Sequence, residues 1–426
     1  MLDLSICPFG RGGESGTGGT MEPSPSADLL SSLPEDLRDE ILLRLDLRDA
    51  VRTSALSRAW RHFWKSLSEL SLSFPKGTPP SAVDSVLRRY TGPRVSRFAF
   101  DVNGASVAPV DDWLIALSCR GVESIDFSGL LVSGYLNLHS SIFSCNRLVS
   151  LELSRCKIPP FPAGFTGFPA LQVLMLRFVN FRANVGNQLE VIIRQSPLLH
   201  DLRLHCVYFP DDCPDSLIHA SNLHSLRIFS LYDYGWRIGE LPCLEDADLH
   251  VSEYPEHGHD FGHLLARFAQ VRNLTFFSPL HEVQIPDTLP FTFYNLKNLK
   301  LSACFTRMDA ILLMFTLLRS SLNLEKLEIE SRNYNRPDIG ADFEFLNDQW
   351  TDGMCPSLQV VQMIHIDRLP TEISFMKLIL SKANLLRTLY VDESPYSSDD
   401  PLVEIQNCTR ASAQARVLFK EFISTW

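Results

Sequence analysis

The chain has 426 residues, of which 45% are hydrophobic and 21% charged, and its formal net charge is −11. This composition predicts a folded protein with a large core. The acidic balance argues against a nucleic-acid partner, because neutralising phosphates requires clustered Lys and Arg. No run of eighteen uninterrupted apolar residues occurs, so we expect neither a membrane span nor a membrane partner.

Residues 1–27 are rich in Gly, Ser and Pro and lack the basic start and apolar stretch of a signal peptide. They are predicted to be a disordered leader. The ten cysteines lie at irregular, mostly wide intervals without a CxxC pair, which is typical of reduced thiols and not of a disulfide framework. This usage predicts a protein of the nucleus and/or cytoplasm.

Residues 28–66 have the apolar spacing of three short helices. Pro34 suits a first helical turn, Asp46 and Ser57 are candidate caps, and Trp60 belongs to the third helix. The apolar face of the first helix comprises Leu33, Leu37, Ile41, Leu42 and Leu45. A unit of this size has too little interior to shelter every apolar side chain that it carries. Some of these side chains are therefore expected to face a partner.

After residue 66 a six-residue pattern recurs, with apolar residues at its first, fourth and sixth positions. Successive copies start 21 to 34 residues apart, which brackets the period of leucine-rich repeats, about 20 to 29 residues. Each copy predicts a strand followed by a returning segment, and stacked copies form a solenoid with a parallel sheet on its concave face. The thirteen copies start at Leu67, Val95, Val122, Leu148, Leu171, Leu199, Leu223, Leu244, Val271, Leu296, Leu324, Leu358 and Leu386.

Some returning segments, such as 187–196 and 308–321, have helical spacing. The longest step between repeats predicts an inserted loop within 331–357. Overall, we expect an α/β protein with leucine-rich repeats over 67–350. Further repeats and a closing helix are expected over 351–426.

Residues 33–64 resemble the F-box of plant proteins. The likeness rests on Leu33-Pro34, on Ile41-Leu42, and on a terminal signature that runs from Leu56-Ser57 to Trp60 and Trp64. The whole chain is similar to plant F-box proteins with leucine-rich repeats, and residues 355–394 resemble the FBD region that often closes them. That region departs from the FBD pattern at 367–374, where the family usually has a glycine-containing, acidic segment.

The resemblance implies a substrate-recognition subunit of a Skp–cullin–F-box ubiquitin ligase. The F-box would dock on a Skp-type adaptor, and through it on a cullin, while the repeats bind an unidentified target protein. The implied adaptor-binding residues are Leu33, Pro34, Leu37, Ile41, Leu42, Leu45, Val51 and Trp60. An alternative is that the helices cap the first repeat, and both roles can coexist on opposite faces.

Outward positions of three successive strands suggest a target site. We predict a column of Arg177, Arg203 and Arg227 that receives a carboxylate- or phosphate-bearing partner. Its predicted neighbours are Met175, His205 and Phe229. Alternatively, these positions are merely polar, and Asp201 neutralises an arginine across strands. Two other functions remain open: a receptor for a small anionic ligand that completes a protein-binding site, and a scaffold that does not promote degradation.

No catalytic motif is present. The chain lacks GxSxG, HExxH and a phosphate loop, and the glycine-rich stretch at 10–19 misses GxGxxG. His257, His259 and His263 with Asp260 contain metal-binding groups, but their spacing matches no zinc motif and favours a polar turn. We therefore expect no enzyme activity, no metal and no cofactor.

Overall fold

The computed structural model forms two compact units. The first comprises residues up to 171 together with 179–182, and the second comprises 172–178 and residues from 183 onward. The predicted leader lies outside the described residues. Within the described ranges, no helix combines the length and apolarity needed to cross a membrane. The structure describes residues 33–56, 58, 60–103, 110–130, 134–181, 188–208, 217–232, 237–253, 261–277, 288–333, 342–393 and 403–420.

The first unit begins with the predicted small helices. The Asp46 carboxylate caps the second one by accepting the Asp49 backbone N–H at 2.8 Å. Pro34 lies at the cap position before the first helix, one residue earlier than predicted. Ser57, the other predicted cap, lies outside the described residues. The elements are α1 (Glu35–Leu43), α2 (Leu47–Arg52), the 3-10 turn η1 (Thr53–Ala55) and α3 (Trp60–Ser66).

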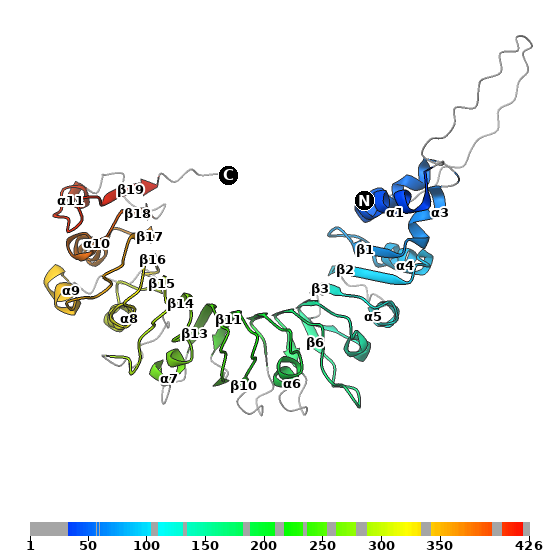
Figure 1. The fold of residues 1–426 in the computed structure, drawn as a ribbon, viewed down its shortest axis with the longest axis horizontal. Coiled ribbons are helices and arrows are strands. Elements are labelled where there is room, and N and C mark those ends of the chain that lie inside the picture. Colours follow the sequence, from blue (N-terminus) through cyan, green and yellow to red (C-terminus); the bar gives the residue numbers. More distant parts are fainter. Residues whose placement is uncertain are drawn as a thin grey trace, which may run out of the picture. The chain divides into compact units, whose positions relative to one another are not determined.

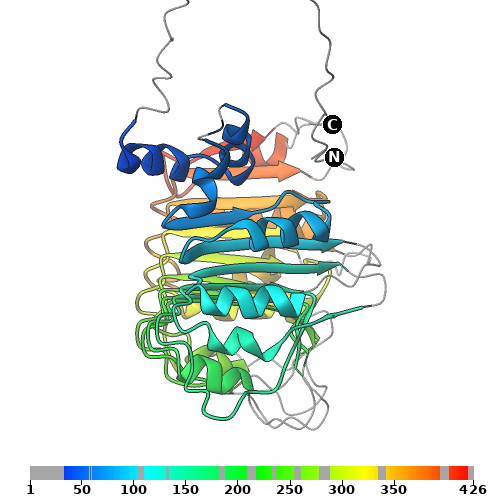
Figure 2. The same ribbon diagram turned by 90° about the vertical axis from the view of Figure 1, so that its right-hand side faces the viewer.

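Parallel strands in the order β1, β2, β3, β5 follow in the first unit. The helices α4 and α5, blue to cyan, lie against one face of these strands (Figure 2). Aromatic side chains fill the space beneath, with Phe98 stacked on Phe127 at 6.1 Å and Phe100 edge-on to Trp113 at 5.2 Å. The bounds are β1 (Glu69–Ser73), α4 (Pro80–Arg89), β2 (Arg94–Asn103), α5 (Val110–Cys119), β3 (Ser124–Leu130), β4 (Leu136–Asn137), η2 (Ser140–Ser144), β5 (Ser150–Ser154), β6 (Cys156–Ile158) and β8 (Asn180–Phe181).

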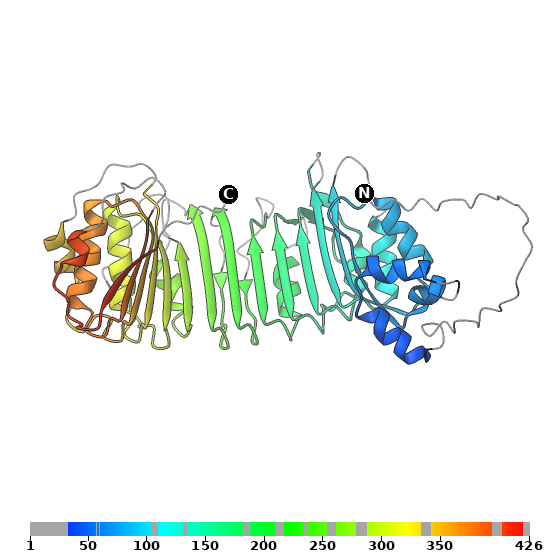
Figure 3. The same cartoon turned by 90° about the horizontal axis from the view of Figure 1, so that it is seen from above.

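The second unit contains a longer parallel sheet, whose strands run the same way (Figure 3). Together the two units confirm all thirteen predicted strands, as well as the α/β solenoid class. The strands of the second unit's sheet, in order, are β7 (Val173–Arg177), β9 (Asp201–His205), β11 (Ser225–Tyr232), β13 (Asp246–Glu253), β14 (Asn273–Phe277), β15 (Asn298–Ala303), β16 (Lys326–Ser331), β17 (Val360–Ile366), β18 (Thr388–Glu393) and β19 (Arg416–Lys420). A small separate pair is formed by β10 (Leu217–Ile218) and β12 (Arg237–Ile238).

Helices of the second unit lie on one face of its sheet (Figure 1). We call the other face the open face; it carries the outward residues of each strand, such as Arg203 and Arg227. The predicted helices within 187–196 and 308–321 are confirmed as α6 and α8. The helix bounds are α6 (Gln188–Arg194), α7 (Phe261–Ala266), α8 (Met308–Arg319), α9 (Phe343–Gln349), α10 (Pro370–Lys382) and α11 (Val403–Gln406).

The predictions for the last third of the chain need correction. The segment expected to be an inserted loop contains α9, which is capped by Asp342 through the Phe345 N–H. The last described element is the strand β19 and not a closing helix. This strand escaped prediction because polar Gln414 stands where the pattern begins, leaving only Val417 and Phe419 to mark it.

The buried carboxylate of Glu372 on α10 is hydrogen-bonded to the end of β16 and to the residue that follows β17. Glu372, in the first turn of α10, is fully buried and accepts hydrogen bonds from Ser331 Oγ and from Asn333 Nδ2, the latter at 3.0 Å. It also accepts the backbone N–H groups of Asp367 and Leu369. Burial raises the pKa of Glu372, whereas these hydrogen bonds oppose the rise. The donors therefore offset the desolvation of a buried acid.

Removing one of these donors should destabilise the second unit. Asn333→Ala removes a bond to Glu372 and also the acceptor for the Phe305 N–H, which is bonded to Asn333 Oδ1 at 3.1 Å. We expect a loss of about 2 to 3 kcal/mol in unfolding free energy, measured by urea denaturation of the full chain. The control is Asn323→Ala, because the exposed Asn323 amide donates to the Tyr294 carbonyl and has no other hydrogen-bond partner among the described residues. Equal losses in both variants would contradict this role.

Candidate functional site

The helix α1 and the turns that follow α1 and η1 present apolar side chains to solvent. Leu37, Ile41 and Leu45 are exposed, as predicted from their helical face, with Leu37 at 47%. Leu43 and Leu56 are also exposed, although their spacing did not place them on that face. Pro34 is exposed, and Leu33 and Val51 are half-buried. We call the five exposed side chains Leu37, Ile41, Leu43, Leu45 and Leu56 the apolar patch.

Two of the predicted adaptor-binding residues lie elsewhere. Leu42 and Trp60 are 1% and 2% exposed, so the structure assigns them to the core of the first unit and not to its surface. The small helices need these side chains to build any interior at all. Arg38 adds a further contact, with its guanidinium 4.1 Å from the centre of the Phe63 ring on α3.

The helical segment also covers the first strand of the repeats. Both α1 and α2 contact β1. In the last turn of α3, the Lys65 carbonyl accepts the backbone N–H groups of Thr91 and Gly92 at 2.8 and 3.1 Å. These contacts support the predicted alternative of a cap on the first repeat. They leave the apolar patch exposed, so capping and docking do not compete for the same side chains.

On the open face of the second unit, strand register sets which side chains are neighbours. Met175, Arg203 and Arg227 are paired across β7, β9 and β11. Arg177 is not part of this row, because it pairs with His205 one step further along the strands. The predicted column of three arginines is therefore wrong. The correct row of arginines contains two, and Arg177 shares the next row with His205 and Phe229.

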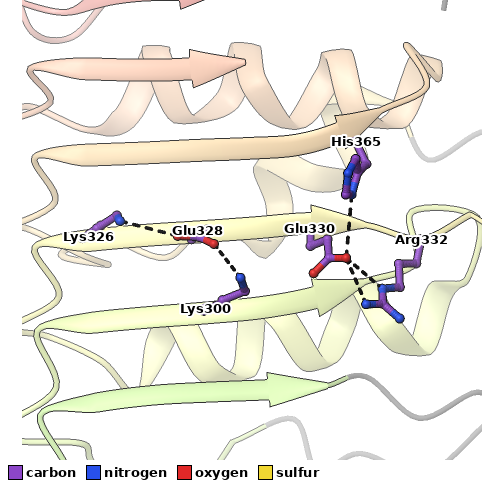
Figure 4. A network of polar contacts seen from close by, with 6 residues as sticks. All are labelled: Lys300, Lys326, Glu328, Glu330, Arg332 and His365. Atoms are coloured by element: carbon purple, nitrogen blue, oxygen red, sulfur yellow. Dashed lines mark hydrogen bonds and ion pairs between the residues drawn. The ribbon is translucent and has the colours of Figure 1, made fainter. Parts of the chain in front are cut away.

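Most basic side chains on this face are neutralised. Arg203 pairs with Asp201 at 2.5 Å on its own strand. The alternative prediction, in which Asp201 neutralises an arginine, named an arginine of a neighbouring strand instead. Lys300 and Lys326 both bind Glu328, at 2.8 and 3.4 Å. A second group of contacts centres on Glu330, which binds Arg332 at 2.9 Å and lies 3.7 Å from His365 (Figure 4).

Arg227 differs from these cations. Its side chain is exposed, and it makes no ion pair with any residue in the described part of the chain. The nearest acidic position is Asp248, which is paired with Arg227 on the next strand and whose pKa is raised by burial, against the opposing charges of Arg227 and Lys300. Arg227 therefore retains its capacity for a bidentate bond to a carboxylate.

The next row forms a ladder of rings. His205 lies 4.2 Å from Phe229, Phe229 lies 4.3 Å from His250, and His250 stacks on Phe277 at 3.8 Å. The Arg332 guanidinium covers the far end, 4.8 Å from the Phe277 ring. We call His205, Phe229, His250 and Phe277 the ring ladder. His250 and Phe277 were not predicted, although both occupy the same position, just after the repeat pattern, as His205.

The turn after β9 fixes one end of this ladder. Cys206, directly after His205, has a left-handed backbone with φ of 48° and donates its N–H to the Phe229 carbonyl at 2.7 Å. Phe178 adopts the same conformation after β7 and donates to the His205 carbonyl at 2.7 Å. Its ring lies edge-on to His205 at 5.3 Å. These bonds hold the ends of neighbouring strands level, so that their rings meet.

The histidines of the ladder are neutral near pH 7. Burial lowers the pKa of His250 to about 4, with a further lowering by Arg332 that Glu330 opposes. Burial and the Arg177 charge also lower the pKa of His205. The ladder therefore presents uncharged rings beside the row that contains Arg203 and Arg227.

Two shallow hollows lie on the open face. The first, about 390 Å³, is bounded by side chains of β11, β13, β14 and β15 and includes Arg227, Asp248 and Lys300. The second, about 430 Å³, lies over β17, β18 and β19 and includes the exposed Tyr390 and Leu418. Every residue that lines either hollow belongs to neighbouring strands of the one sheet, so the described residues supply a floor without an opposing wall.

No catalytic centre emerges from the described residues. Among them, no group of three or more His, Cys, Asp or Glu side chains is placed to hold a metal ion. His257, His259 and Asp260 lie outside the described residues, and His263 lies on α7. Burial raises the pKa of Cys145, Cys156 and Cys355 to about 12, which suppresses the reactive thiolate.

Comparisons with known proteins identify the domains that carry the apolar patch and the open face. Residues 30–72 match the F-box domain, and residues 110–261 match the leucine-rich repeats of the FBD-associated F-box protein At5g56370. The chain is thus similar to F-box proteins with leucine-rich repeats. It is 27% identical to the F-box/FBD/LRR-repeat protein At1g13570 of Arabidopsis thaliana, over 92% of this chain and 99% of that protein.

Two other relatives of the chain are also F-box proteins. The putative FBD-associated F-box protein At5g56700 of Arabidopsis thaliana is 26% identical over 86% of this chain and 98% of its own. F-box/LRR-repeat protein 13 of the same plant is 32% identical over 42% of each chain. F-box domains typically bind Skp-type adaptors. The predicted FBD region at 355–394 lies outside the matched domains and stays a prediction.

The ring ladder of this F-box protein predicts a pH dependence of stability. Between about pH 4 and pH 6.5 an unfolded histidine binds a proton that folded His250 does not, so stability should fall as pH drops from 7 to 5. His250→Phe keeps a ring but removes the titration. The variant should lose less stability over this range, by on the order of 1 kcal/mol because the ring is only partly buried.

The measurement is urea unfolding of both proteins at pH 7 and pH 5. The carboxyl groups of Glu372 and Asp248, whose raised pKa values act in the opposite direction, are common to both proteins and cancel in the comparison. An identical pH dependence in the two proteins would show that His250 is not held neutral by the fold.

Proposed function

We propose that this protein is the substrate-recognition subunit of a Skp–cullin–F-box ubiquitin ligase. The apolar patch of the F-box docks on the Skp-type adaptor, which connects the chain to a cullin. The open face of the second unit binds the target protein for ubiquitination. The chain itself is non-catalytic and acts by proximity, raising the effective concentration of target lysines near the conjugating enzyme.

The observation that carries this proposal is the exposure of the apolar patch. Its leucines and isoleucine stay in solvent although the same helices bury Leu42 and Trp60 and pack on β1. Fully burying a Leu or Ile side chain contributes about 1.5 to 3 kcal/mol, so a partner that covers half-exposed side chains gains roughly half of that for each. Large apolar side chains left exposed together on one short helical segment are typical of an interface.

The shape of the open face favours a protein target over a small ligand. Sites for small molecules bury most of the ligand in a cleft. Both hollows here are lined by strands of a single sheet face, which suits a segment that lies flat on it. A scaffold that does not promote degradation would use the same surfaces, and target abundance after depletion of this protein separates the two functions.

We also propose that the protein works in the nucleus and/or cytoplasm. The described cysteines are all free, and several are buried within the repeats. Free thiols of this kind are stable in a reducing compartment. A fluorescent fusion seen only in secretory compartments would contradict this proposal.

Adaptor docking should depend on the patch and not on apolar exposure in general. Leu37→Glu with Ile41→Glu places charges in the interface without disturbing the core, unlike substitution of the buried Leu42. We expect the affinity for a purified Skp-type adaptor to fall about 100-fold, or nearly 3 kcal/mol, measured by biolayer interferometry.

The matched control for this experiment is Leu322→Glu. Leu322 lies in the second unit and is 47% exposed, the same fraction as Leu37. It should keep wild-type affinity, with folding of all variants checked by circular dichroism. Unchanged binding by the folded double variant would leave the F-box helices with the capping role alone.

A further inference from the structure

We propose that Arg227 and the exposed part of the ring ladder form one site, which recognises a target segment carrying a carboxylate two residues from an aromatic side chain. This inference rests on the proposed function, in which the open face selects the target. It specifies where on that face recognition occurs and which chemistry it reads. The site is formed by Arg227, His205, Phe229 and His250.

Spacing supports the pairing of a carboxylate with a ring. Arg227 and Phe229 are two residues apart on β11 and lie on the same face, so their Cα atoms are separated by about 6.6 Å. Side chains at positions i and i+2 of an extended peptide project to one side with the same separation. An extended segment can therefore place its carboxylate at Arg227 and its ring at Phe229 simultaneously.

The aromatic half of the site is organised before binding. Phe229 is held between His205 and His250 at centroid distances of 4.2 and 4.3 Å, and all three rings are half-buried. Rings already fixed by their neighbours lose little rotamer freedom when a partner arrives. The neutral histidines extend the apolar surface on both sides of Phe229. Rigid aromatic surfaces of this kind supply the anchors of protein interfaces.

The charged half of the site is selective for a single carboxylate. Arg227 is exposed and has no ion-pair partner among the described residues, whereas Arg203 is held by Asp201. The hollow beside Arg227 also contains Asp246 and Asp248. Asp248 lies directly opposite Arg227, whereas Asp246 lies opposite Ser225 and would repel a second carboxylate placed at that end of the hollow.

Neighbouring parts of the sheet lack this combination. On β15 and β16, Lys300 and Lys326 share Glu328, and Arg332 holds Glu330 (Figure 4). A partner there would have to break existing pairs and desolvate their charges for little net gain. Over β17 to β19, Arg416 is exposed two residues before Leu418, which is paired with the exposed Tyr390. Tyr390 has no ring contact among the described residues, whereas β9, β11 and β13 place an exposed arginine beside rings that already contact one another.

The test uses three fluorescein-labelled ten-residue peptides built on a Ser/Thr background. Their cores are Asp-Thr-Phe, Asn-Thr-Phe and Asp-Thr-Ala, and binding to the full chain is measured by fluorescence anisotropy. We expect the first peptide to bind at least tenfold more tightly than the other two. Equal affinities for all three peptides, or no binding of the first at millimolar protein, would overturn the proposal.

Variants assign the preference to the residues. Arg227→Gln should abolish the discrimination between the Asp and Asn peptides, and Phe229→Leu should abolish that between the Phe and Ala peptides. Phe229→Leu keeps an apolar side chain of similar size, so it tests the ring without leaving a large cavity. The matched control is Arg416→Gln, another exposed arginine on the same sheet face, which should bind like wild type. Discrimination that survives Arg227→Gln would contradict the assignment.

Two further measurements distinguish failure of this site from failure of the proposed function. Competition by 3-phenylpropionate at the peptide concentration would show that the site takes a small aromatic acid, which overturns recognition of a protein segment. Adaptor affinity of the Arg227→Gln variant is measured in parallel and should equal that of wild type. A negative peptide result with intact adaptor binding would thus reject this site and leave the docking function of the F-box standing.

Discussion

The structure of the repeats depends on one constraint. Apolar residues that are paired in register on neighbouring parallel strands are buried together. Leu174, Leu202 and Leu226 are paired across three strands and are all fully buried. Because side chains alternate along a strand, burying one set in register forces the intervening set into straight rows on the opposite face. A slip of one residue would exchange the two sets. The core therefore dictates the surface.

The rows bring together residues that are far apart in sequence. The strands β9, β11 and β13 each contribute a charged residue to one row and, two positions later, a ring to the next row. Neighbouring strands are about 4.8 Å apart, and Lys300 and Glu328 form an ion pair across that gap. Where a row contains rings, the same spacing allows them to stack, as His250 and Phe277 do. Arg227 forms no ion pair among the described residues, although Asp248 lies opposite it on the next strand.

The sequence predicts the elements well and side-chain exposure less well. Thirteen strands follow from a recurring pattern, whereas β19 lacks its first apolar residue. The column of arginines failed because Arg177 stands just after its pattern while Arg203 stands inside it, a difference of one row. On the F-box, resemblance names the correct helices, but Leu42 and Leu43 are adjacent in sequence and differ completely in exposure. The packing of α1 and α2 on β1 decides which of them faces solvent.

The most direct test of the division between a docking patch and a recognition face is hydrogen–deuterium exchange of the full chain with and without a purified Skp-type adaptor. The account predicts slower exchange in α1, α2 and η1 on adaptor binding, with no change in β9, β11 and β13. Protection of those three strands without protection of the helices would contradict it, because the adaptor would then occupy the surface assigned to the target.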